Sequence, residues 1–187
     1  MKDRTKMKTV ADLLHWEPYL TVEQLDELKA VACPAEIGRK QAPQDLNDIT
    51  LGQLIQLEVV GAEKGIFAAI AVVLLGRSEE WAMSAPTLPM LGLRNMVVAE
   101  QDRIAGLFKM LEREPDAAEV MAGIDKLNFG MFGLADWYAK RMGIQDHDAV
   151  FDTPWIRIWQ CRKNDIEQGE YQERLQRSRM TLSKSQR

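Results

Sequence analysis

The densest cluster of polar side chains in the sequence is Asp146-His147-Asp148. Carboxylate and imidazole groups bind divalent metal ions, so this cluster would suit a metal-dependent hydrolase. Such a site needs further histidine or aspartate ligands from other helices, and the only other histidine is His15. The alternative is structural, because Asp146 can cap a short helix and Asp148 favours its dipole. We predict the helix start and keep the metal-dependent hydrolase as an alternative.

Cys161 is the second candidate, because Arg162 and Lys163 follow it directly. Neighbouring cations lower the pKa of a thiol and raise its reactivity. A nucleophilic cysteine also requires a base and an oxyanion site, and no such constellation, glycine-rich phosphate loop or dinucleotide fingerprint is present. Neither histidine follows a glutamate at the Glu-x-x-His spacing of di-iron bundles. The sequence therefore predicts a non-enzymatic protein with no catalytic residue, metal or cofactor.

The elements that would position these residues are helices. Of the 187 residues, 46% are hydrophobic and 28% charged, which is typical of a soluble globular protein. Helical apolar spacing recurs along the chain, and no strand alternation or hairpin signal is found. We therefore predict an all-α fold, a compact bundle of five or six main helices with a long C-terminal helix and a basic tail.

Helix boundaries follow from capping residues, glycines and prolines. Thr21 and Thr50 are predicted to cap helices, and a nearly all-apolar helix is expected over 62–75. A further helix is expected over 93–114. Another over 117–142, capped by Asp116 and ended by Gly143, would keep one apolar face for six turns, with a local break at Gly130 or Gly133 as the alternative. The loop before Thr50 contains two prolines and a glycine and no helical period.

Three segments are expected from this pattern. Residues 1–47 form an N-terminal arm, short helices and a linker, with 1–8 disordered. Residues 48–180 form the helical domain, and residues 181–187 a disordered basic tail.

The long helix begins near Thr153, a predicted N-cap, and Pro154, which suits the first helical position. Its apolar residues fall on two nearly opposite faces. The first half is predicted to close the core through Trp155, Ile158, Trp159 and Ile166, and Lys163 could make a cation–π pair with Trp159. The second half is predicted to bind a partner through Tyr171, Arg174, Leu175, Arg177 and Arg179.

Charge and cysteine content restrict the partners and the compartment. Four basic residues against Asp3 give residues 1–8 a net charge of +3, and eight against four acids give 153–187 a charge of +4. The total is −4, so the centre carries −11, which argues against nucleic acid as the partner. Two distant cysteines suggest a reducing compartment. The longest apolar run, 66–75, is too short for a membrane span, and no secretion signal is found.

Three segments, 129–138, 146–155 and 48–58, carry a family resemblance; the first holds Phe-Gly-Met-Phe-Gly and the second Asp-His-Asp. Over roughly residues 48–175 the chain resembles small helical proteins encoded among phage or prophage tail genes, and among these the tail assembly chaperones. The resemblance implies a helper in the bacterial host cytoplasm that binds the tape-measure protein, or another tail protein, and aids assembly of the tail tube. A structural virion subunit, such as a connector or ring component built from copies of the chain, is the alternative.

Overall fold

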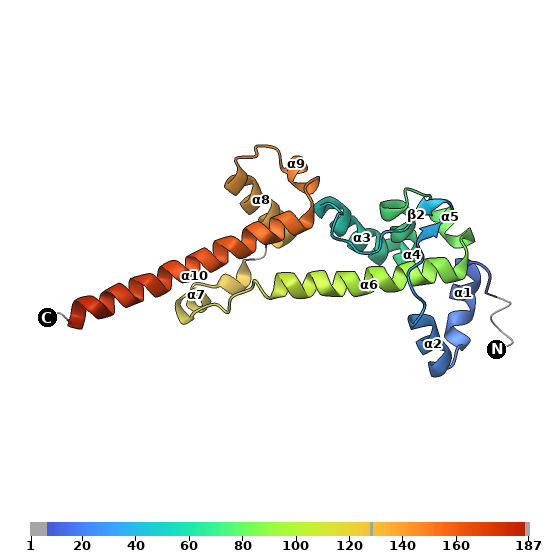
Figure 1. Cartoon of the computed structure of the whole chain (residues 1–187), viewed down its shortest axis with the longest axis horizontal. Coiled ribbons are helices and arrows are strands. Elements are labelled where there is room, and N and C mark those ends of the chain that lie inside the picture. The colour runs from blue at the N-terminus through green and yellow to red at the C-terminus, as the bar shows by residue number, and fades with distance from the viewer. Residues whose placement is uncertain (1–6, 128, 186–187) are drawn as a thin grey trace. The chain divides into compact units, whose positions relative to one another are not determined.

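The computed structural model describes residues 7–127 and 129–185, which are mainly helical (Figure 1). Ten α-helices and one two-stranded sheet lie within these residues, which confirms the predicted all-α fold class and the long C-terminal helix. The chain forms two compact units, Met1–Ala105 and Gly106–Arg187. The boundary expected between residues 47 and 48 therefore does not divide these units.

The first unit contains six helices, one of which continues into the second unit. Its elements are α1 (Val10–Trp16), the 3₁₀ turn η1 (Glu17–Tyr19), α2 (Val22–Lys29), β1 (Glu36–Ile37), β2 (Lys40–Gln41), α3 (Leu51–Lys64), α4 (Ile66–Ala69), the π-helical turn η2 (Ile70–Leu74), α5 (Glu79–Ser84) and α6 (Thr87–Lys109). Thr21 and Thr50 cap α2 and α3 as predicted, each with a glutamine completing a capping box.

The N-terminal segment packs within the first unit. The backbone N–H of Val10 donates to Ala85 O, and that of Thr87 donates to Lys8 O, both at 3.0 Å. The expected disorder of residues 1–8 is therefore wrong for Lys8, and residues 1–6 lie outside the described part. Asn95 of α6 holds the end of α2, because its side-chain amide donates to Leu28 O at 2.9 Å and also to Lys29 O and Val31 O.

Gly92 allows α6 to cross the chain after α2 at close range. A Cβ atom at this position would lie 2.0 Å from Ala32 O, closer than any carbon atom can approach an oxygen without a bond. The crossing therefore requires glycine.

Two sequence predictions need correction in the first unit. The helix capped by Thr50 was expected to end near Gly61, before the apolar helix predicted over 62–75. Instead α3 continues to Lys64 and the break falls at Gly65, whose φ of +89° ends the helix. The loop predicted between residues 34 and 47 contains a small hairpin, β1 paired with β2. Gly38 and Arg39 both have positive φ, as a tight hairpin turn requires, and each strand is too short to show alternation.

The second unit begins in the last turn of α6 and continues with α7 (Ala117–Met121), η3 (Ile124–Lys126), α8 (Gly130–Met142), α9 (His147–Phe151) and α10 (Trp155–Ser185). The single helix predicted over 117–142 is wrong. Gly123 and Gly130 have φ of +81° and +50°, which a right-handed helix does not allow, so the apolar period continues across two separate helices. Gly143 ends α8 as predicted, with φ of +68°.

Helix α10 starts one residue later than predicted and ends later. The Thr153 hydroxyl donates to Ala149 O at 3.1 Å, which ties the predicted cap residue of α10 back to α9. The helix continues to Ser185, so the disordered tail expected from 181 is wrong as far as residue 185, and residues 186 and 187 lie outside the described part. Among the described residues, no helix has both the length and the apolar character that crossing a membrane would need.

Candidate binding surfaces

Asp146-His147-Asp148 begins α9. The Asp146 carboxylate accepts the backbone N–H of Asp148 at 2.9 Å, which is the predicted helix cap. His147 Nε2 lies 3.4 Å from Asp136 Oδ1 on α8, and its ring stacks on Phe132 with centroids 5.2 Å apart. In the described part of the chain, no group of three or more histidine, cysteine, aspartate or glutamate side chains is placed to hold a metal ion. The cluster thus joins α9 to α8.

Asp136 is the charged centre of this contact. Lys140, four residues along α8, donates to its carboxylate at 2.6 Å, and this hydrogen bond, together with that of His147, lowers the pKa of Asp136 below its usual value. The contacts of Asp136 and His147 are with Lys140, with Phe132 and with each other, so these two side chains hold α8 and α9 together.

Cys161 is approached by a cation that the sequence did not indicate. Arg141 of α8 lies 3.4 Å from its Sγ and also binds both carboxylate oxygens of Asp165, at 2.9 to 3.1 Å. The adjacent cations lie elsewhere, since the Arg162 guanidinium is 5.1 Å from the Trp137 ring centroid and the Lys163 ammonium is 5.5 Å from that of Trp159. The predicted Lys163–Trp159 pair is therefore present. Arg141 and Arg162 together fasten α8 to α10.

The first half of α10 carries the residues predicted to close the core. Trp155 and Ile158 are fully buried, and the Trp155 ring lies 6.1 Å from that of Phe108. Trp159 is half-buried and its indole N–H donates to Leu107 O at 3.0 Å. Ile166 is also half-buried and lines a groove described below.

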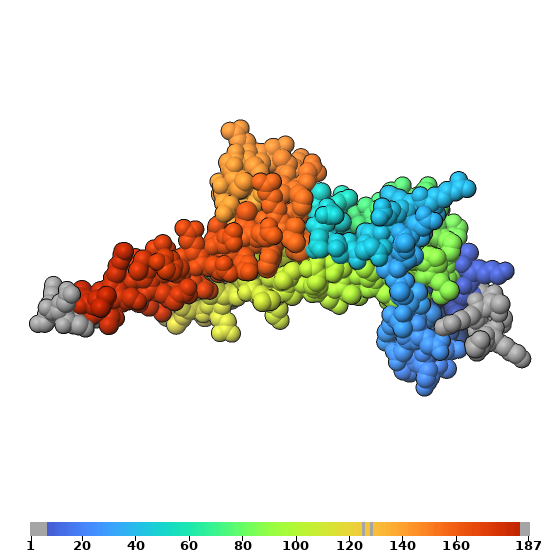
Figure 2. Space-filling model, in the orientation of Figure 1, coloured from blue at the N-terminus to red at the C-terminus, as the bar shows by residue number. Residues whose placement is uncertain are grey.

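The second half of α10 carries the residues predicted to bind a partner. Tyr171 is 54% exposed and Leu175 is half-buried. Arg174 and Arg177 pair with Glu170 and Glu173, each one turn earlier on the same helix. Arg179 is exposed. Figure 1 shows this end of α10 (red) continuing past α7 as one helix, and Figure 2 shows its atoms on the surface in that view. The intrahelical pairs support the helix where its own unit does not cover it.

A wide groove of about 1,110 Å³ lies between the 108–134 segment and α10 in the second unit. Its apolar lining includes Phe108, Met110, Ile124, Leu127, Met131 and Ile166. Several of these side chains are largely exposed, Met110 by 80% and Leu127 by 61%. On its α10 side the groove has Arg162, Glu170 and Glu173. The sequence predicted Ile124, Leu127 and Met131 on one face of a single helix, but the helix is broken at Gly123 and Gly130, and these side chains border the open groove.

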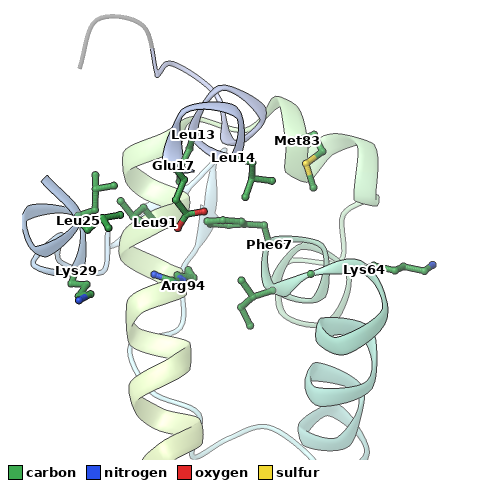
Figure 3. Close-up of a pocket in the computed structure, with 13 residues that line it drawn as sticks. Leu13, Leu14, Glu17, Leu25, Lys29, Lys64, Phe67, Met83, Leu91 and Arg94 are labelled. Atoms are coloured by element: carbon green, nitrogen blue, oxygen red, sulfur yellow. The ribbon is translucent and has the colours of Figure 1, made fainter. Parts of the chain in front are cut away.

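A smaller pocket of about 400 Å³ lies in the first unit, among α1, α2, α4, α5 and α6 (Figure 3). Leu14, Phe67, Met83 and Leu91 contribute to its apolar wall. Figure 3 shows the Glu17 side chain pointing into this space beside Phe67, with Arg94 reaching in from α6. Leu25 and Leu28 of α2 also line it. The sequence did not indicate Glu17 or Arg94 as site residues, because their presence in one pocket depends on how η1 and α6 pack.

No protein-family model, curated protein or solved structure matches this chain. The function must therefore be inferred from the geometry of these surfaces and from the sequence resemblance.

Proposed function

We propose that this protein is a non-enzymatic assembly chaperone for a phage tail, which binds an amphipathic helical segment of the tape-measure protein in the groove of its second unit. The observation that carries the proposal is the open apolar groove beside α10. A groove lined by methionine, leucine and phenylalanine suits the apolar face of a partner helix. Unbranched, flexible methionines adapt to many similar faces without reading each sequence.

The proposed action is shielding. An isolated tape-measure helix would expose its apolar face and aggregate, whereas a helix seated in the groove would be kept from other copies until tube subunits assemble around it. This action needs no catalytic group, and the bacterial host cytoplasm is the proposed place. The Tyr171 to Arg179 surface begins beside the end of the groove, whose lining reaches Glu173, and continues along the same helix, so a long partner helix could contact both.

Co-expression with a helical fragment of the tape-measure protein from the same phage or prophage region tests the proposal. We expect the fragment to stay soluble and to co-purify with the chain. A fragment that is soluble alone and never co-purifies would contradict the proposal. Native mass spectrometry of the chain alone is the second measurement, and a large closed ring would favour the structural virion subunit instead.

Matched variants locate the binding surface. Leu127→Glu and Met131→Glu each place a charge in the groove at a side chain that is already partly exposed, so the fold should tolerate them. We expect each to weaken co-purification at least tenfold, because the partner's apolar face would have to bury a carboxylate. Val59→Glu makes the same change at a half-exposed site on α3 and should leave binding unchanged.

A further inference from the structure

The pocket of the first unit combines an apolar wall with two opposite charges. Its volume of about 400 Å³ is within the range of about 300–1,000 Å³ common for small-molecule sites. Leu13, Leu28, Phe67 and Leu91 are each at most 9% exposed and form its floor. Glu17 and Arg94 lie on its polar side. Such a site favours a ligand that has one apolar group and both signs of charge.

The two charges are not neutralised by the protein. Within residues 7–127 and 129–185, neither the Glu17 carboxylate nor the Arg94 guanidinium has an ion-pair partner. The other two cations of the lining are already paired, Lys29 with Asp26 and Lys64 with Glu79. Glu17 and Arg94 therefore remain for a ligand.

Arg94 is also held in place. Its Nη1 donates to Asn95 Oδ1 at 3.4 Å, and the amide nitrogen of Asn95 is fixed by three backbone carbonyls at the end of α2. A guanidinium positioned in this way loses less conformational freedom on binding a carboxylate than a freely rotating one. Its parallel N–H groups can donate to both carboxylate oxygens.

We propose that this pocket binds a free α-amino acid with a large apolar side chain, such as leucine or phenylalanine. The α-carboxylate pairs with Arg94, the α-ammonium pairs with Glu17, and the side chain lies against Phe67, Leu14 and Met83. A fatty acid could pair with Arg94 but would leave the Glu17 carboxylate without a partner, and an apolar amine could pair with Glu17 but would leave the Arg94 guanidinium without one. Only a zwitterion satisfies both charges at once.

Calorimetric titration of the full chain tests this site. L-leucine and L-phenylalanine should bind saturably, and N-acetyl-leucine and leucinamide should each bind about tenfold more weakly, because each lacks one charge. Failure of both amino acids to bind saturably overturns the proposal. Equal affinity for leucine and its two derivatives also overturns it, because the α-ammonium and α-carboxylate would then contribute nothing to binding.

Two variants place the ligand. Arg94→Gln should weaken leucine binding about tenfold and leave leucinamide affinity unchanged, because the amide has no carboxylate to lose. Glu17→Gln should weaken leucine binding similarly and leave N-acetyl-leucine unchanged. Glu58→Gln, an exposed change on α3 outside the pocket, should alter neither. Leucine affinity unaffected by Arg94→Gln and Glu17→Gln would overturn the site. The titration is independent of the tape-measure test, because the pocket and the groove belong to different units.

Discussion

The two units differ in where their apolar side chains lie. Among the described residues, 23 of the 29 buried apolar side chains belong to the first unit and only six to the second. Large exposed apolar side chains show the reverse distribution, with seven in the first unit and twelve in the second. Eight of those twelve fall between Met110 and Phe132, the segment that borders the groove.

This difference indicates two kinds of binding surface. The first unit buries most of its apolar residues, and its cavities include a small apolar pocket that carries both signs of charge. The second unit is held by a few specific contacts, Trp155 in its core and Arg141 and Arg162 between α8 and α10, and leaves a long apolar wall open. A small pocket suits a small ligand, whereas an open wall suits a helix of another protein.

The largest expected effect is that of Trp155→Ala on the small core of the second unit. Removing a fully buried tryptophan should lower the free energy of unfolding by about 3–5 kcal/mol. Tyr171→Ala, on the exposed half of the same helix, should change it by less than about 0.5 kcal/mol. Urea denaturation followed by circular dichroism measures both. Equal losses would show that α10 does not divide into a core half and an exposed half.

Gly92→Ala should destabilise the first unit by about 1–3 kcal/mol or more, because the new methyl group would overlap Ala32 O. Gly106→Ala is the matched control on the same helix. Nothing lies within 4 Å of a Cβ at Gly106, so this change should stabilise by about 0.4–1 kcal/mol. Thermal unfolding gives the sign, and hydrogen exchange should place the effect of Gly92→Ala in the first unit. A neutral Gly92→Ala would mean that α6 does not cross the chain so closely.

The sequence predicted the helices that have local signals at their ends. The boxes at Thr21 and Thr50, the cap at Asp116 and the stop at Gly143 all depend on one to four neighbouring residues, and all are present. The break at Gly65 was missed and the break at Gly130 was only an alternative, because apolar periodicity continues through both positions and does not record the sign of φ.

The candidate sites were less predictable, because they depend on tertiary packing. Asn95, Arg94 and Glu17 come together only when α6 packs against α2 and η1, and their separation in sequence carries no signal. Likewise Arg141 reaches Cys161 from another helix, whereas the adjacent Arg162 and Lys163 lie on tryptophan rings. The residues of the groove were recognised as apolar, but their exposure followed from the break at Gly130.

Glu100 should have a moderate effect in the first unit. Its carboxylate accepts the Leu46 N–H at 3.1 Å and binds Arg103, and the Arg103 hydrogen bond lowers the pKa of Glu100. Glu100→Ala should cost about 1 kcal/mol at pH 7, at the low end for a charged hydrogen bond because Arg103 is partly exposed. Because the pKa of Glu100 is lowered in the folded protein, its charge contributes fully to the free energy of unfolding above about pH 4.5. This contribution is lost as the pH falls below that value.

Chemical denaturation of wild type and variant at pH 7 and pH 3 measures this dependence. Glu100→Gln keeps an acceptor for Leu46 and should lose only the part due to charge. A difference between wild type and Glu100→Ala that grows as the pH falls would contradict the sign of the pKa shift.

The smallest expected effect is that of Asp136 in the second unit. The pKa of Asp136 is lowered first by the Lys140 hydrogen bond and then by that of His147. The carboxylate therefore stabilises the folded unit fully above about pH 3.8, and this stabilisation is lost as the pH falls below that value. Asp136→Asn should lower the melting temperature slightly at pH 7, because Lys140 is exposed and His147 is only half-buried, so solvent screens both interactions. The difference should disappear at pH 2.5. Lys140→Gln removes only the first partner, so a larger loss there than for Asp136→Asn would mean that Lys140 stabilises the unit through a contact other than Asp136.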